Sequence, residues 1–258
     1  MSKGNRTKSP GSAKSRSARE KIKEQQAAAR ARDKRKRVVT YVTAGAVAVA
    51  AVGLGWWYAA STSRSEEATA ALAPVTVQAD GSVVMAKAGV TAPVVDIYED
   101  FQCPACKEAE RVSGPTFKNL AAEGKAKVVY HPITIFSQEP LRSNSVRAGN
   151  AVRCIADGKQ WMAFHDLLFQ NQPPEGVEGF KTDELLQWGK QAGVTAPDFQ
   201  QCVTSQKNAQ AQLDYSKKIS DAQKLTHTPT VKLNGTEIDN AVLFSPSQLR
   251  DEITEAAK

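Results

Sequence analysis

The chemistry of this chain is indicated most directly by two cysteines separated by two residues, in the segment Cys103-Pro104-Ala105-Cys106. Residues 93–98 before this segment are typical of a short apolar strand, and residues 107–120 after it of a helix. The first cysteine therefore lies at a strand-to-helix junction, where unpaired N–H groups and the helix dipole lower a thiol pKa. Since the pair can also close a disulfide within one helical turn, Cys103 can attack and Cys106 can resolve. We predict a redox-active pair.

Two structural interpretations compete with redox chemistry for this pair. A zinc site needs four ligands, but the sequence has no second CxxC or CxxH, and His131, His165 and His227 show no ligand spacing. An inert structural disulfide is the other alternative, although so tight a loop at a helix start is rarely used in that way. The strand–CxxC–helix context favours the redox pair, and the sequence predicts no metal site and no bound cofactor.

The other two cysteines, Cys154 and Cys202, are predicted to form a second, structural disulfide. Four cysteines allow three pairings, and the CxxC pair strongly prefers itself. The bridge would join two parts of one helical region, with Cys154 in the helix before Asp157-Gly158 and Cys202 in a short helix at 198–205. Two buried free thiols are the alternative, which is common in cytosolic proteins and unusual in exported ones.

Positive charge is concentrated at the start of the chain. Residues 1–37 contain fourteen Lys/Arg and three acidic residues, a local net charge of +11, so the remainder of the +7 chain carries −4. This tail is rich in Ser, Gly, Ala and Gln and nearly lacks large apolar residues, which predicts disorder. Nucleic-acid binding is one reading of such a tail, but the segment that follows it favours another.

Residues 38–60 form a run of 23 residues without a charge. A helix of this length spans about 34 Å, enough for a hydrocarbon core of ~30 Å, and Trp56, Trp57 and Tyr58 provide an interfacial aromatic belt. We predict an uncleaved transmembrane signal anchor. A cleaved signal peptide is the alternative, although its apolar and basic regions would both be unusually long.

The basic cluster beside this span sets the expected orientation. By the positive-inside rule the tail stays cytoplasmic, next to anionic lipid rather than nucleic acid, and the C-terminal bulk is extracytoplasmic. All four cysteines then lie in an oxidising compartment. Residues 61–74, rich in Ser, Thr and Ala, read as a linker, and residues 75–258 as one domain with its own core.

The pattern within residues 75–258 predicts a thioredoxin-like α/β fold with an inserted helical subdomain. A hairpin at 75–86 precedes the strand at 93–98, the CxxC helix and a strand within 125–136, which together make a β-α-β unit. The CxxC helix should kink or break at Gly114-Pro115. Helices dominate at about 141–224, with breaks at 157–158, 173–174 and 193–197. A hairpin with an Asn234-Gly235 type I′ turn and a last helix from Ser245 complete the domain.

Three segments resemble the DsbA-like thiol–disulfide oxidoreductases, specifically the membrane-anchored forms of high-GC Gram-positive bacteria. They are YEDFQCPAC at 98–106, CIADGKQWMAFHDLLF at 154–169, and THTPT at 226–230 before a strand. Together they span nearly all of residues 80–258. The combination and order of the motifs are more specific than the CxxC alone.

The resemblance implies roles for the matching residues. Cys103 looks like the exposed nucleophile and Cys106 like the buried resolving thiol. Thr228-Pro229 looks like the cis-proline loop that lies against the dithiol and pairs with the substrate backbone. An ordinary trans proline at a strand start is the alternative for Pro229, because proline is tolerated there.

Two departures from the family pattern concern the polar environment of the thiols. DsbA has a histidine between its cysteines, whereas Ala105 offers no hydrogen bond to a thiolate. The family often places an acid six residues before the first cysteine, where this chain has Ile97. Asp96, Glu99 and Asp100 lie nearby, and the sequence leaves open which of them assists Cys106; as loop acids, most are expected to be solvated.

The expected function is oxidation of reduced exported polypeptides by a Cys103–Cys106 disulfide. The resemblance implies a membrane partner of the DsbB or VKOR type that reoxidises the pair. An isomerase or reductase is the first alternative, because threonine before the cis-proline is also found in isomerases. A non-enzymatic surface protein or chaperone with a structural CxxC is the second.

Overall fold

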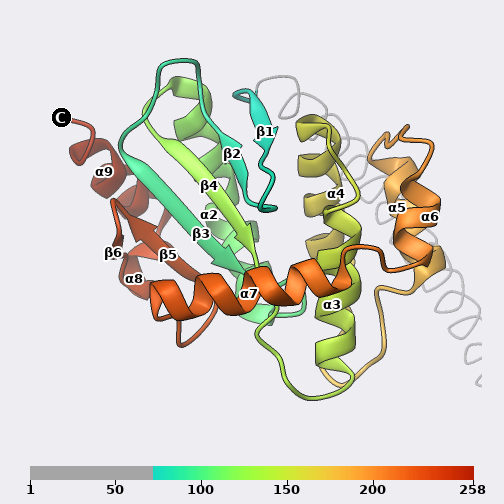
Figure 1. Cartoon of the computed structure of the whole chain (residues 1–258). Helices are drawn as coiled ribbons and strands as arrows, with labels where there is room; N and C mark the ends of the chain where they lie inside the picture. Colours follow the sequence, from blue (N-terminus) through green and yellow to red (C-terminus); the bar gives the residue numbers. More distant parts are fainter. Residues whose placement is uncertain (1–71) are drawn as a thin grey trace, which may run out of the picture. The chain divides into compact units, whose positions relative to one another are not determined.

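A computed structural model describes residues 72–258 and shows one six-stranded sheet covered by helices (Figure 1). The predicted tail, the membrane anchor and all but the last residues of the linker lie outside this range. Within residues 72–258, no helix is both long enough and apolar enough to cross a membrane.

The centre of the sheet is formed by the two parallel strands β3 (Val94–Glu99) and β4 (Lys127–Pro132). The order β1-β2-β4-β3-β5-β6 places antiparallel strands on both sides. These are β1 (Val75–Val77), β2 (Val83–Met85), β5 (Thr230–Leu233) and β6 (Thr236–Glu237). In β3, Ile97 belongs to the main core and Tyr98 to a smaller cluster with Tyr215, as the alternation of side chains along a strand requires.

Helix α2 (Pro104–Glu123) begins directly after Cys103, which is its N-cap residue. The sequence predicts a kink or a break at Gly114-Pro115; a break is wrong, because the helix continues through Pro115 to Glu123. Pro115 has no N–H, so the Arg111 carbonyl one turn earlier loses its helical hydrogen bond. Both residues are exposed, so water can solvate that carbonyl. Burial of Phe117 and Leu120 against the sheet keeps the last turns in place.

The predicted helical region is confirmed, and the three predicted breaks lie at or between helices, while the sequence does not predict a fourth break, between α6 and α7. It contains α3 (Leu141–Val152), α4 (Gly158–Gln170), α5 (Thr182–Gln191), α6 (Phe199–Thr204) and α7 (Ala209–Gln223). The Asp157 carboxylate accepts a hydrogen bond from the Gln160 N–H at 2.9 Å and caps α4. These helices separate the β3-α2-β4 unit from the C-terminal hairpin.

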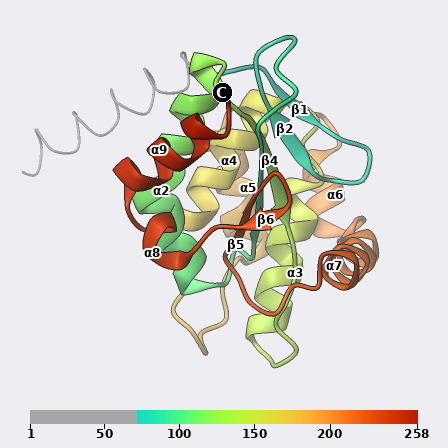
Figure 2. The same ribbon diagram turned by 90° about the vertical axis from the view of Figure 1, so that its left-hand side faces the viewer.

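The C-terminal part completes the predicted thioredoxin-like α/β fold. Asn234 and Gly235 have φ values of 49° and 84°, as a type I′ turn between β5 and β6 requires. Two helices follow, α8 (Asn240–Leu243) and α9 (Pro246–Glu255); Ser245 is the N-cap residue of α9, but its side chain makes no capping hydrogen bond. Figure 2 shows α2 and α9 together on one side of the sheet and α7 on the other.

Candidate active site

The fold places the CxxC pair where β3 ends and α2 begins. Cys103 and Cys106 are both free thiols, with exposed fractions of 6% and 1%. The expectation that Cys103 is exposed is therefore wrong. Pro104 and Ala105, between the two cysteines, are exposed. Cys103 is covered because the loop before β5 packs against it.

That covering loop contains Thr228-Pro229, whose peptide bond is cis, as the resemblance implies. The Cys103 thiol donates a hydrogen bond to the Thr228 carbonyl oxygen at 3.4 Å, across 125 residues of sequence. The Thr228 hydroxyl is buried and has no hydrogen-bond partner among residues 72–258. It is therefore available to the Cys103 sulfur when that sulfur becomes a thiolate.

The environment shifts the pKa values of the two thiols in opposite directions. The Cys106 thiol, which donates to the Cys103 sulfur, lowers the pKa of Cys103 to about 6 against the opposing effect of burial, and Thr228 and the N–H groups of Cys106 and Ala105 add to it. Burial raises the pKa of Cys106 well above its ordinary value, and the nearby Cys103 thiolate adds to this increase. The pair therefore carries one thiolate and one thiol at neutral pH.

The acids beside the CxxC are buried, so the interpretation of them as solvated loop acids is wrong for Glu99 and Asp100. Their exposed fractions are 1% and 0%. The Asp100 carboxylate accepts hydrogen bonds from the N–H groups of Gln102 and Ile135, both at 2.9 Å, and from the Ser145 hydroxyl at 2.8 Å. Burial raises the pKa of Asp100 to about 7, although these hydrogen bonds oppose the increase.

Glu99 belongs to a buried network of charged groups beneath α2. Its carboxylate contacts His165 Nε2 at 2.7 Å, while His165 Nδ1 contacts Asp166 at 3.0 Å. Both Asp166 oxygens accept from Lys118 Nζ at 2.7 Å. Burial disfavours the charged imidazole, but the Glu99 and Asp166 carboxylates outweigh it and raise the pKa of His165 to about 10.

Sequence reasoning missed this role of His165 because it tested the histidines only for metal-ligand spacing. The available signal was a histidine four residues after Trp161 on the buried face of α4, since a buried imidazole needs polar partners. The remaining nearby acid, Asp96, points away from the CxxC and pairs with His131 at 2.9 Å. Position 97 itself holds a buried isoleucine in the main core.

A cavity of about 370 Å³ adjoins this network between α2 and α4. Its lining consists of Lys107, Glu110, Arg111, Pro115, Lys118, Asp166, Phe169 and Gln170. Glu110, Glu99 and His165 bring three metal-type ligand atoms within 4.8 Å of one another. Both nitrogens of the His165 imidazole already contact carboxylates. Burial and the nearby Glu99 charge raise the pKa of Glu110 to about 7. Glu99, Glu110 and His165 therefore belong to one network of ionisable groups.

The other predicted pair is separate from the CxxC. Cys154 and Cys202 are joined by a disulfide across 48 residues. Cys154 lies just beyond the C-terminal end of α3, rather than within a helix, and Cys202 lies in α6. The bridge therefore connects two parts of the helical region, and no atom of it contributes to the dithiol site.

Comparison with known proteins identifies a family model and relatives that this chain resembles. The family model described as thioredoxin matches residues 88–252. DsbA of Mycobacterium tuberculosis is 30% identical, with a TM-score of 0.58 over 72% of this chain and 92% of that chain. The disulfide bond oxidoreductase DsbG of the same organism, in its reduced form, is 31% identical, with a TM-score of 0.57 over 66% and 82%.

A protein of Rickettsia bellii named for protein-disulfide oxidoreductase activity is 25% identical over 165 residues, or 64% of this chain and 62% of that protein. The chain thus spans less than two thirds of the length of this relative. The thioredoxin match covers strands β3 to β6, the CxxC helix and the cis-proline loop together, and the mycobacterial DsbA is matched over 92% of its length. The chain therefore belongs to the thioredoxin family, within its DsbA-like group.

Proposed function

We propose that the protein is a thiol–disulfide oxidoreductase that introduces disulfides into exported polypeptides. The observation that carries the proposal is the position of Cys103, at the N-cap of α2 and hydrogen-bonded to the cis Thr228-Pro229 loop. This position and the burial of Cys106 one turn away shift the two thiol pKa values in opposite directions. A disulfide between such thiols is readily opened, because the sulfur with the lower pKa is stable as a thiolate.

The exchange begins with a thiolate of the reduced polypeptide attacking the Cys103 sulfur. The Cys103–Cys106 bond breaks, and Cys106 leaves and takes up a proton, which its high pKa favours. The second cysteine of the polypeptide, as a thiolate, then attacks the polypeptide sulfur of this mixed disulfide. Cys103 leaves as a thiolate, which its pKa of about 6 favours. The polypeptide has lost two electrons and two protons, and the Cys103–Cys106 disulfide has been reduced to the dithiol.

The first experiment tests the roles of the two cysteines. C103S should abolish disulfide transfer to a reduced test protein. C106S, mixed with the same test protein in its oxidised form, should instead accumulate mixed disulfides that are visible on non-reducing gels. The Cys103 thiolate can still open a substrate disulfide, but the Cys106 thiol that would release the adduct is missing. Retained transfer in C103S, or a C106S variant free of adducts, would contradict the assignment.

The direction of the exchange is a separate part of the proposal. Isomerase or reductase activity is the second candidate, because Thr228 precedes the cis-proline and Ala105 replaces the histidine of DsbA. The pKa of Cys103, about 6, lies below the thioredoxin value of about 7 and above the DsbA value of about 3.5, so the reduction potential is the measurement that decides the direction. An oxidase should have a reduction potential nearer about −120 mV than the thioredoxin value of about −270 mV.

The proposed setting is the outer face of the cytoplasmic membrane, with residues 38–60 as anchor and residues 1–37 in the cytoplasm beside anionic lipid. A membrane partner of the DsbB or VKOR type would reoxidise the dithiol. A cysteine introduced into residues 1–37 should be shielded from impermeant thiol reagents in intact cells, whereas reduced Cys103 should be labelled. Labelling of both positions, or release of a soluble mature domain, would exclude this topology.

A further inference from the structure

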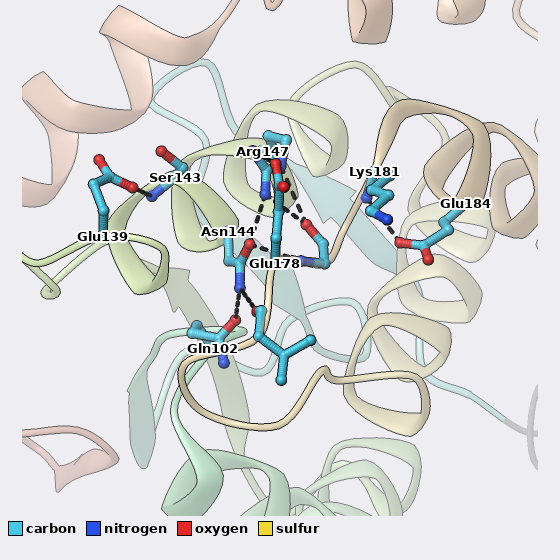
Figure 3. Close-up of polar contacts among 10 residues, drawn as sticks. Gln102, Glu139, Ser143, Asn144, Arg147, Glu178, Lys181 and Glu184 are labelled. Atoms are coloured by element: carbon cyan, nitrogen blue, oxygen red, sulfur yellow. Dashed lines mark hydrogen bonds and ion pairs between the residues drawn. The ribbon is translucent and has the colours of Figure 1, made fainter.

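The residue before the nucleophile, Gln102, is attached to the helical region by its buried side chain. Its exposed fraction is 0%, and its amide oxygen accepts a hydrogen bond from Asn144 Nδ2 at 2.7 Å (Figure 3). Its Nε2 donates to the Pro173 carbonyl oxygen at 3.2 Å. Gln102 thus connects the active-site segment to α3 and to the loop between α4 and α5, residues 171–181.

Asn144 fixes the same loop at two further points. Its Nδ2 also donates to the Val177 carbonyl oxygen at 2.8 Å, and its Oδ1 accepts from the Gly179 N–H at 2.9 Å and from Arg147 Nη2 at 2.6 Å (Figure 3). Asn144 is itself fully buried, at 0% exposure. The amide therefore uses all four of its hydrogen-bonding positions, and a polar network satisfied in this way rigidifies what it joins.

The N-terminal side of the 171–181 loop is tied to the active-site backbone itself. Gln172 Nε2 donates to the carbonyl oxygens of Phe101 and Cys103 at 2.8 and 2.9 Å. The loop thus adjoins the nucleophile at one end and is fixed to α3 at the other. A loop without helix or strand needs such contacts to hold one conformation, and here they are buried or part-buried and include the backbone of the reacting cysteine.

The outer surface of this loop is apolar at its centre and acidic on both sides. Val177 is 50% exposed, and Glu175 and Glu178 beside it are also exposed. Glu178 forms an ion pair with Arg147 at 3.5 Å, whereas Glu175 has no ion-pair partner among residues 72–258. Ile135, which is 40% exposed, lies on a second loop. Its own N–H donates to the Asp100 carboxylate. Two of the three exposed large hydrophobic side chains in residues 72–258 therefore belong to loops that are hydrogen-bonded to the active-site segment.

We propose that residues 173–178 are a substrate-recognition loop, and that Asn144 is the positioning residue that holds this loop in register with Cys103. The occupant is the polypeptide segment flanking the reacting cysteine of the substrate. Val177 contacts an apolar side chain of that segment, and Glu175 and Glu178 favour basic over acidic flanking residues. Because the loop is fixed before the substrate arrives, binding does not have to order it. This inference rests on the proposed exchange reaction and adds a substrate class to it.

The experiment uses the oxidised protein and two reduced peptides with the same pair of cysteines, one flanked by Leu and Lys and the other by Leu and Glu. The protein should have a kcat/KM about fivefold higher for the Lys peptide, as expected for two exposed charge pairs. E175K/E178K should reverse this preference, mainly through KM, and E175K alone, which leaves the Glu178–Arg147 ion pair in place, should reduce it. E252K, a charge reversal at an exposed position on α9, should keep it. Equal rates for both peptides, or an unchanged preference in E175K/E178K, would overturn the proposal.

The positioning role is tested with N144D, which keeps the size of the side chain and its acceptors but loses the donors to Gln102 and Val177. The ratio of kcat/KM for the Lys peptide to that for the Glu peptide should fall toward one in N144D, measured below its unfolding temperature. S143A, at the adjacent position, should keep the ratio of the native protein. Loss of activity toward both peptides with the preference intact would indicate a merely structural Asn144.

Dithiothreitol, which has no flanking residues, separates failure of this inference from failure of the proposed function. If the native protein oxidises dithiothreitol and both peptides at rates independent of flanking charge, only the recognition loop is excluded. If it oxidises none of them, the oxidase function itself fails.

Discussion

At the scale of single residues, Cys103 and Cys106 show how one small site produces two different thiols. Cys103 lies at the N-cap of α2, where N–H groups and the Cys106 thiol can donate to its sulfur. Cys106 lies one turn further into the same helix at 1% exposure, where burial disfavours a charge. Because the thiolate on Cys103 also repels a second negative charge on Cys106, each thiol increases the difference between the two.

Thr228 provides a test of this account at a single atom. In T228V the hydroxyl is replaced by a methyl group of similar size, so the pKa of Cys103 should rise above its value of about 6. The measurement is the thiolate absorbance near 240 nm as a function of pH in the reduced protein. T230V is the matched control, because the Thr230 hydroxyl donates to the His227 carbonyl oxygen rather than to a thiol. An unchanged titration in T228V would remove Thr228 from the list of groups that stabilise the thiolate.

At the scale of elements, the sequence predicts well whatever local chemistry determines. The turn at Asn234-Gly235 requires positive φ at both residues, and the break before α4 has an Asp157 cap, so both are readable from a few neighbouring residues. The same holds for the CxxC at the junction of an apolar strand and a helix.

The errors concern burial, which depends on residues distant in sequence. Glu99 and Asp100 read as loop acids, yet His165 and Ser145 from the helical region cover them. The link from Gln102 to Asn144 spans 42 residues and leaves no periodic signal. Pro115 fails to break α2 because its side of the helix faces solvent, which the local motif does not reveal.

The disulfide between Cys154 and Cys202 gives the prediction that belongs to this scale. Closing a loop over 48 residues removes unfolded-state entropy, so C154S/C202S should reduce the free energy of unfolding by up to about 4 kcal/mol in the chain-entropy model. Urea unfolding of the variant and the native protein, both with the CxxC reduced, measures the difference. Since the bridge lies away from the CxxC, the Cys103 titration should keep its midpoint. A shift of that midpoint would show that the bridge also shapes the dithiol site.

At the scale of the whole molecule, the site combines parts from the entire described chain. The CxxC comes from the β3–α2 junction, the cis-proline loop from the segment before β5, and the buried partners of Asp100 and Glu99 from the helical region. A charge on Cys103 is therefore stabilised by the folded protein as a whole. The unfolded chain, in which Thr228 and the helix N–H groups are dispersed, cannot provide this stabilisation, so the redox state of the pair is linked to global stability.

This linkage predicts a pH dependence that only the reduced protein has. The pKa of Cys103 falls from an ordinary 9.0 to about 6 on folding, so its contribution is fully present above pH 9 and is lost as pH falls through 6. The free energy of unfolding of the reduced form should therefore increase, relative to the oxidised form, by up to about 4 kcal/mol between pH 6 and pH 9.

Other groups titrate in the same range, but they are present in both redox states. The raised pKa of Asp100, about 7, lowers stability as pH rises from about 4 to 7, and the raised pKa of His165, about 10, lowers it as pH rises from 6.5 through 10. Subtracting the oxidised from the reduced curve cancels the parts of these contributions that both forms share. It leaves the contribution of the thiols, together with the part of the Asp100 shift that the Cys103 thiolate causes. Urea unfolding of both forms at pH 5.5, 7 and 8.5 measures that difference. This difference in the free energy of unfolding should grow with pH in favour of the reduced form. Parallel curves would mean that folding does not stabilise the Cys103 thiolate. The proposed oxidase would then lose its physical basis.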